Sequence, residues 1–349
     1  MKKFEFGVYS LADIGSDPLT GKTPSPSQRL NEILQMADLT ESLGLDVFGV
    51  GEHHRLDYVV SAPPVVLSAI SQRTKHIKLT STTTVLSTVD PVRLFEDFAT
   101  LDLLSNGRAE ILAGRGAFIE SFPLFGYSTN DYDALFEENL LLLQQLNAQE
   151  RVTWSGQFRP ALNNADISPR PFNQEIPIWV GVGGTPESAV RAGRVGVGMA
   201  LAILGGPLDR FQPLVKLYRK SGQNHPDKLK VGVTGHLFIA ETTEQAREQF
   251  YPYYKNYWQY VNQQRGSFSF QLSFEQFIEI TGPNMALFVG SPEDVAEKII
   301  KQYELFGHSR FLAQPDIGGQ PFELVKNSMY LFANKVVPIV RNHIKMKSY

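Results

Sequence analysis

The feature that most constrains the fold is a strict alternation of short apolar runs with longer amphipathic segments along nearly the whole chain. The apolar runs predict eight strands, at residues 4–10, 46–51, 77–84, 109–113, 178–182, 198–203, 230–240 and 310–313. Helical periodicity follows each of them, for example over 28–43, where the pattern stops at Gly44. Eight alternating units with right-handed crossovers predict a parallel sheet closed into a (β/α)₈ TIM barrel. A doubly wound open sheet is the structural alternative.

Length alone would suggest about two domains, but α/β barrels often exceed about 250 residues as one domain, so we expect one domain over residues 1–349. Two segments interrupt the alternation. Residues 151–160 predict a small hairpin that turns at Ser155-Gly156. Residues 266–289 form an insertion after the seventh strand that contains several phenylalanines, Phe268, Phe270, Phe274 and Phe277. An insertion of this length predicts a lid or binding loop, and a surface excursion packed by its own phenylalanines is the alternative.

Composition excludes several classes of function. The 33 basic and 36 acidic residues nearly balance, which favours neither nucleic acid nor an anionic membrane as a partner. The chain has no cysteine, so disulfides, thiolate metal sites and cysteine nucleophiles are excluded. No apolar stretch approaches the length of a membrane span, and residues 1–7 lack the apolar run of a secretory signal. We therefore expect a soluble cytoplasmic protein that acts on a small molecule.

In a barrel, functional residues gather at the carboxyl ends of the strands. The second strand ends in Gly51-Glu52-His53-His54, and adjacent side chains on a strand point in opposite directions. One imidazole can therefore face the barrel mouth, and we assign His53 to proton transfer because imidazole titrates near pH 7. For His54 we expect a hydrogen-bonded structural role. With no cysteine and no carboxylate triplet nearby, we predict no metal site.

Two glycine-rich loops predict a site for a phosphate group. Gly114-Arg115-Gly116 follows the fourth strand, where the glycines allow close approach and the guanidinium suits phosphate; a turn with an exposed arginine is an equal alternative. The fifth strand runs into residues 183–188, where glycines and Thr185, the expected N-cap, precede a helix and predict an anion site. A dinucleotide fingerprint would require glycine in place of Pro186, so we predict no nicotinamide site.

Several motifs together resemble those of the bacterial luciferase-like monooxygenases. These are Glu52-His53-His54, the stretch 85–127 with Asp90-Pro91-Val92-Arg93 and Ser105-Asn106-Gly107-Arg108, the loop 183–188 and the segment 289–296. The resemblance covers nearly the whole chain. It implies a (β/α)₈ barrel, commonly dimeric, that binds reduced FMN or a deazaflavin coenzyme.

The resemblance also implies roles for individual residues. It places His53 near the reactive edge of the flavin and a non-prolyl cis peptide at Thr82-Thr83 beneath the flavin ring. The expected phosphate ligands are residues of the two glycine-rich loops, namely Arg115, Gly183, Gly184, Thr185 and Ser188. Residues 268–288 correspond to a mobile loop that shields the reaction from water. Gly114 stands where luciferase has a reactive cysteine, which argues against luciferase itself.

The resulting hypothesis is an FMN-dependent monooxygenase that uses reduced FMN and O₂ to oxidise a small organic substrate. The aromatic insertion and the apolar sixth strand suggest that the substrate is apolar. Because no nicotinamide site is predicted, a separate flavin reductase would supply reduced FMN to an expected homodimer. One alternative is a deazaflavin-dependent oxidoreductase on the same fold, for which Arg55 is the nearest extra basic residue. The other is a flavin-binding protein without turnover.

Overall fold

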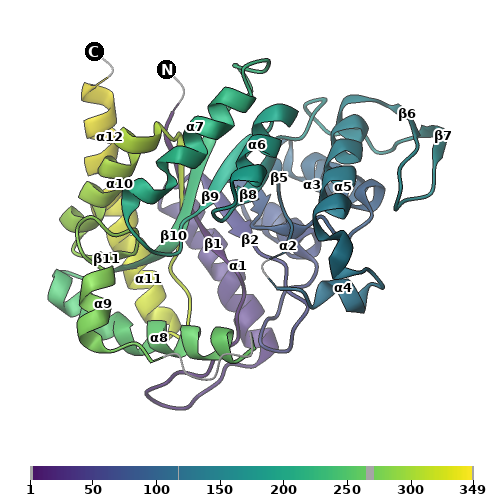
Figure 1. Cartoon of the computed structure of the whole chain (residues 1–349). Helices are drawn as coiled ribbons and strands as arrows, with labels where there is room; N and C mark the ends of the chain where they lie inside the picture. Colours follow the sequence, from purple (N-terminus) through teal and green to yellow (C-terminus); the bar gives the residue numbers. More distant parts are fainter. Residues whose placement is uncertain (1–2, 117, 265–270, 348–349) are drawn as a thin grey trace.

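The computed structural model describes residues 3–116, 118–264 and 271–347 and contains a closed barrel of eight parallel strands (Figure 1). The strands pair in chain order, and β1 pairs with β12 to close the barrel. Their bounds are β1 (Glu5–Ser10), β2 (Val47–Val50), β3 (Lys78–Ser81), β5 (Ala109–Gly114), β8 (Ile178–Val182), β9 (Gly198–Ala202), β10 (Val231–Ile239) and β12 (Arg310–Gln314). The predicted barrel is thereby confirmed, and the open-sheet alternative is wrong.

Helices surround the barrel, and local sequence signals account for where many of them begin and end. The principal ones are α1 (Pro26–Ser42), α2 (Pro63–Arg73), α3 (Pro91–Ser105), α5 (Tyr132–Ala148), α6 (Pro186–Val195), α7 (Gln212–Ser221), α8 (Thr243–Gln264), α10 (Pro292–Phe306), α11 (Phe322–Leu331) and α12 (Val337–Met346). Ser25, Asp90 and Ser291 cap the first turns of their helices, each of which opens with proline. Among the residues that the structure describes, no helix combines the length and apolar character needed to cross a bilayer.

The two ends of the barrel differ in what covers them. Figure 1 shows both termini at one end of the barrel and helix α8 crossing the other. The chain enters β1 from the first end, so α8 lies over the carboxyl ends of the strands. Aromatic side chains of α8 form a buried cluster with Phe277 of the short helix α9 (Phe274–Ile280) and Val289 of β11 (Phe288–Gly290). Aromatic residues therefore cover the carboxyl end of the barrel.

Three expectations about local structure need correction or refinement. The predicted third strand, 77–84, is broken into β3 and β4 (Thr84–Val85), with Thr82 and Thr83 between them. The hairpin is longer than 151–160, because β6 (Arg151–Trp154) pairs with β7 (Leu162–Asp166) across a loop whose N–H groups bind the Glu138 carboxylate. Within the insertion 266–289, the described part holds α9 and β11, whereas Phe268 and Phe270 lie outside the described residues.

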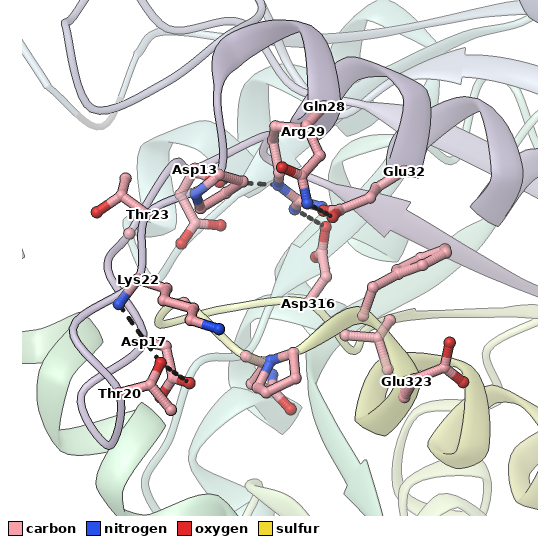
Figure 2. Close-up of a pocket in the computed structure, with 17 residues that line it drawn as sticks. Asp13, Asp17, Thr20, Lys22, Thr23, Gln28, Arg29, Glu32, Asp316 and Glu323 are labelled. Carbon is pink, nitrogen blue, oxygen red and sulfur yellow. Dashed lines mark hydrogen bonds and ion pairs between the residues drawn. The ribbon is translucent and has the colours of Figure 1, made fainter.

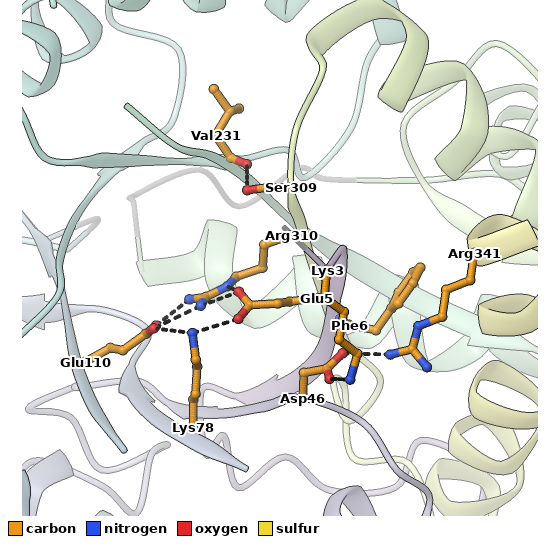
Figure 3. A network of polar contacts seen from close by, with 10 residues as sticks. All are labelled: Lys3, Glu5, Phe6, Asp46, Lys78, Glu110, Val231, Ser309, Arg310 and Arg341. Carbon is orange, nitrogen blue, oxygen red and sulfur yellow. Dashed lines mark hydrogen bonds and ion pairs between the residues drawn. The ribbon is translucent and has the colours of Figure 1, made fainter. Parts of the chain in front are cut away.

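A buried ionic cluster fills the amino-terminal end of the barrel (Figure 3). Arg310 donates to Glu5 at 2.8 Å and 2.6 Å and to Glu110 Oε1 at 3.0 Å, and Lys78 lies 2.6 Å from Glu5 and 3.2 Å from Glu110. The Arg310 guanidinium also stacks 4.5 Å from the centre of the Trp179 ring. Burial by itself raises the pKa of Glu110, but the charges and hydrogen bonds of Arg310 and Lys78 lower it to about 2. This end is occupied by paired charges, which leaves the carboxyl end for ligands.

Candidate functional site

A cavity of about 170 Å³ opens at the carboxyl ends of the strands. It is bounded mainly by apolar groups from the strands and from α8, including Leu11, Leu112, Phe118, Ala200, Ala202, Leu204, Tyr257, Trp258 and Val261. Three of the predicted site residues, His53, Thr82 and Thr83, line this cavity together with Glu52 and Glu120. An apolar wall with a few polar groups is typical of a small-molecule site.

His53 is held in the cavity wall by its backbone and by aromatic neighbours. Its N–H donates to the Val60 carbonyl at 3.0 Å, and its ring lies 4.0 Å from the Tyr58 ring, centre to centre. The Nδ1 atom lies 3.7 Å from Glu120 Oε1, which is beyond hydrogen-bond range but within ion-pair range. Burial raises the pKa of Glu120, yet the contact with His53 and the charge of Arg55 outweigh this and lower it. An ionised Glu120 therefore faces the imidazole and favours a proton on Nδ1.

His54 has the structural role expected for it. Its Nε2 atom lies 2.8 Å from Glu52 Oε1, and the second carboxylate oxygen of Glu52 accepts the Val85 N–H at 3.0 Å. The His54 ring also meets the Phe125 ring edge-on at 4.9 Å. These contacts tie the end of β2 to β4, so His54 fixes the loop that carries His53.

Thr82 and Thr83 form the floor of the cavity, and the peptide bond between them is cis, as the resemblance implies. Both side chains occupy space that neighbouring strands leave free by having glycine. A Cβ atom on Gly49 would lie 2.5 Å from Thr82 Cγ2, and one on Gly114 would lie 2.6 Å from Thr83 Oγ1. The tight contact with Thr83 explains why position 114 has no side chain.

The two glycine-rich loops meet on one side of the cavity. Arg115, at the end of β5, donates to Asp133 Oδ1 at 2.7 Å and to the Thr185 hydroxyl at 3.3 Å. Thr185 is the N-cap residue of α6 by backbone conformation, but its hydroxyl accepts from Arg115 and makes no capping hydrogen bond. The side chain of Arg115 is mostly buried, at 20% exposure, so it is no free arginine on a turn.

Around this contact the structure offers hydrogen-bond donors and free space suited to an anion. The Ser188 hydroxyl is buried and has no partner among the described residues. Apart from each glycine and its two chain neighbours, no described atom lies within 4 Å of the position that a Cβ would take on Gly183 or Gly184. The first turn of α6 adds backbone N–H groups and the positive end of the helix dipole. These residues therefore fit a phosphate group. The two loops predicted to bind phosphate lie close enough together to form one site.

Two residues of this region escaped the sequence reasoning. Arg191 is buried, lies 3.5 Å from Asp133, and has an Nη1 atom with no partner among the described residues. It follows Ser188 by three positions on α6, and that spacing could have indicated a shared helix face. No sequence pattern indicates Asp133, because only the fold brings its helix, α5, beside the loop after β5.

Arg55, the extra basic residue considered for a deazaflavin tail, is already engaged. Its Nε and Nη2 atoms donate to the two carboxylate oxygens of Asp57 at 2.9 Å and 2.8 Å. Its guanidinium also lies 4.5 Å from the centre of the Phe118 ring. Arg55 thus stabilises the loop after β2.

Comparison with known proteins identifies the family. A model of the luciferase-like monooxygenases matches residues 4–309. The chain belongs to this family. Membership establishes a flavin-dependent type of oxidoreductase, and it confirms the resemblance seen in the sequence motifs.

Individual relatives differ in how much of the chain they match and in what their names state. The structure of the monooxygenase RslO1 from Streptomyces bottropensis superposes with a TM-score of 0.82 at 25% identity, covering 96% of this chain and 99% of that one. The oxygenase component of a flavin-dependent trigonelline monooxygenase from Acinetobacter baylyi is 22% identical over 95% of this chain and 94% of its own. An F420-dependent glucose-6-phosphate dehydrogenase from Amycolatopsis mediterranei, which uses a deazaflavin, is 29% identical over 53% of this chain and 58% of its own.

Proposed function

We propose that this protein is an FMN-dependent monooxygenase that uses reduced FMN and O₂ to oxidise a small apolar substrate. The observation that carries the proposal is the juxtaposition of two features at one end of the barrel. One is the cluster of Arg115, Thr185 and Ser188 beside open glycines, and the other is the apolar cavity that contains His53. A phosphate-bearing cofactor held at the first would extend its ring into the second.

The polar groups beside the cavity are of the kind that binds the phosphate of FMN. Arg115, Thr185 and Ser188 would bind the phosphate, with Gly183 and Gly184 allowing its close approach. Thr82 and Thr83 would support the ring system from the cavity floor. Bound reduced FMN would supply the electrons for transferring one oxygen atom of O₂ to the substrate while the other becomes water.

The protein's own contribution is proton transfer and exclusion of water. With Nδ1 of His53 facing Glu120 at 3.7 Å, the Nε2 atom is the nitrogen that exchanges a proton inside the cavity. The aromatic residues Phe118, Tyr257 and Trp258 limit the access of water to that position. The same apolar wall would favour an apolar substrate.

Two further parts of the proposal concern partners. A separate flavin reductase would supply reduced FMN, as the name "oxygenase component" implies for the Acinetobacter relative. We further propose a homodimer formed through α2 and α3, whose outer faces expose Val65 at 71%, Leu103 at 43% and Leu104 at 49%. Sedimentation equilibrium would give twice the chain mass of 39.1 kDa for a dimer, and the chain mass itself would refute it.

The decisive experiment is the measurement of dissociation constants for oxidised FMN, reduced FMN and the deazaflavin coenzyme on the apoprotein, under anaerobic conditions for the reduced form. Preferential binding of reduced FMN is the expected result. Preference for the deazaflavin would instead assign hydride transfer, the chemistry of the F420-dependent relative. Equal affinity for both redox states of FMN would favour a flavin-binding protein without turnover.

A further inference from the structure

A second and larger pocket lies between the loop after β1 and the loop after β12 (Figure 2). Its volume is about 610 Å³, within the range of small-molecule sites. It shares no lining residue with the cavity that contains His53, as far as the described residues show. The proposed flavin site therefore leaves this pocket without a role.

The charges around the pocket are strongly unbalanced. Its lining has five carboxylates, from Asp13, Asp17, Glu32, Asp316 and Glu323, against two cationic side chains, from Lys22 and Arg29. Figure 2 shows Asp13, Arg29 and Asp316 together along one wall, with Asp17 and Lys22 on one side and Glu323 on the other. Such a lining attracts a cation and repels an anion.

The inner wall contains two buried carboxylates, those of Asp13 and Asp316, beside the single guanidinium of Arg29, which also lies 3.4 Å from Glu32. Asp13 and Asp316 are only 3% and 4% exposed. Arg29 forms an ion pair with Asp316 and donates to the backbone carbonyl of Asp13 at 2.9 Å. Oδ2 of Asp13 accepts from the Tyr260 hydroxyl at 2.7 Å and from the Gly318 N–H at 3.1 Å. One positive charge thus faces two carboxylates in a buried position, which is unfavourable unless a further cation is present.

Three acceptor atoms on this wall have no hydrogen-bond partner within the described part of the chain. They are Oδ1 of Asp13, Oδ1 of Asp316 and Oε1 of Gln320. The Gln320 amide is oriented by its own NH₂ group, which donates to the carbonyls of Pro315 at 2.9 Å and Ile317 at 3.0 Å. Buried acceptors without partners call for a donor, and a primary ammonium group offers three N–H donors.

We propose that this pocket binds a small organic cation, a free amine whose primary ammonium group is held by Asp13, Asp316 and Gln320. A metal ion is disfavoured, because the described residues contain no group of three His, Cys, Asp or Glu side chains placed to hold one. The volume of the pocket likewise exceeds what an ion needs and suits an organic chain. Phe322 in the lining supplies apolar surface for that chain.

The protonation behaviour of the wall agrees with this assignment. Burial raises the pKa of Asp13 to about 6; Arg29 opposes the increase, and the neighbouring Asp316 adds to it. A bound ammonium group would replace the missing positive charge and favour ionised Asp13.

Isothermal titration calorimetry of the apoprotein with 1,4-diaminobutane at pH 7.5 tests the proposal. We expect a dissociation constant below about 1 mM, and at least about tenfold weaker binding to Asp13→Asn, which loses a charge-assisted hydrogen bond. Asp38→Asn, on the exposed face of the same helix as Arg29, is the matched control and should bind within about twofold of the wild type. Failure of the diamine to bind, or equal affinity in Asp13→Asn, would overturn the proposal.

Three measurements on the wild-type protein keep the test independent of how the variants fold. The bis-trimethylammonium analogue of the diamine has the same charge but no N–H donors, so it should bind at least about tenfold more weakly. Equal binding of the two would refute an ammonium group held by hydrogen bonds. Saturating FMN should leave diamine affinity unchanged, and displacement of the diamine by FMN would place the amine in the other cavity. Displacement by equimolar Mg²⁺ or Ca²⁺ would indicate a metal site instead.

Discussion

Replacement of Glu110 by glutamine should weaken the fold in a way that depends on pH. The carboxylate of Glu110 lies 3% exposed at the amino-terminal end of the barrel, paired with Arg310 and Lys78. A carboxyl whose pKa falls from 4.5 to about 2 on folding contributes about 3 kcal/mol at neutral pH. The variant also leaves Arg310 with Glu5 as its remaining carboxylate partner, and breaking a buried pair costs about 3–5 kcal/mol. We therefore expect Glu110→Gln to lose about 3–5 kcal/mol of unfolding free energy at pH 7.

The pH dependence separates the charge of Glu110 from simple loss of packing. Because folding lowers the pKa of Glu110, its contribution is complete above its ordinary pKa of 4.5 and is lost as the pH falls toward about 2. The difference in unfolding free energy between wild type and Glu110→Gln should therefore shrink steadily below about pH 4.5. A packing defect would give a difference that does not change with pH.

Urea denaturation followed by circular dichroism between pH 7 and pH 3 measures both quantities. Glu248→Gln, an exposed carboxylate on α8, is the matched control and should change the unfolding free energy by less than about 0.5 kcal/mol. A Glu110→Gln protein as stable as the wild type at pH 7 would refute the role assigned to the ionic cluster. A difference that stayed constant down to pH 3 would refute its electrostatic origin.

The remaining predictions concern the proposed flavin site. Arg115→Met should weaken binding of reduced FMN by at least about 1.5 kcal/mol, measured by fluorescence titration. Arg194→Met, on the exposed end of α6, is the control and should leave the affinity unchanged. Equal affinities of the wild type and Arg115→Met would place the phosphate site elsewhere. His53→Ala should abolish substrate oxidation while FMN still binds within about twofold, and normal turnover in steady-state assays would remove His53 from the mechanism. Gly114→Ala should lower unfolding free energy by about 1–3 kcal/mol because its Cβ would meet Thr83 Oγ1 at 2.6 Å, and an unchanged melting temperature would show that Thr83 moves without cost.

Local signals in the chain were sufficient to predict elements and their order. Proline at the start of α2, α3, α6 and α10, and the caps at Asp90 and Ser291, are properties of neighbouring residues, so they can be recognised without the fold. Where a tertiary interaction decides the local structure, the predicted bounds were wrong. The predicted strand 77–84 breaks between β3 and β4, and the loop of the hairpin is held by Glu138 from another element.

The sequence by itself therefore determined the eight-unit barrel and placed His53, Arg115 and the loop 183–188 at the carboxyl ends of their strands. The spacing of apolar residues and the positions of glycine and proline are sufficient to predict these placements. The reason is that the alternation of strands with helices by itself fixes the strand direction in a parallel barrel. Only the tertiary structure decided which groups meet. Arg115 reaches Thr185, the Ser188 hydroxyl is buried without a partner among the described residues, and Arg29 pairs with Asp316 beside the backbone carbonyl of Asp13. Those pairings depend on strand register and on the closure of β1 against β12, which bring together residues that no local pattern relates.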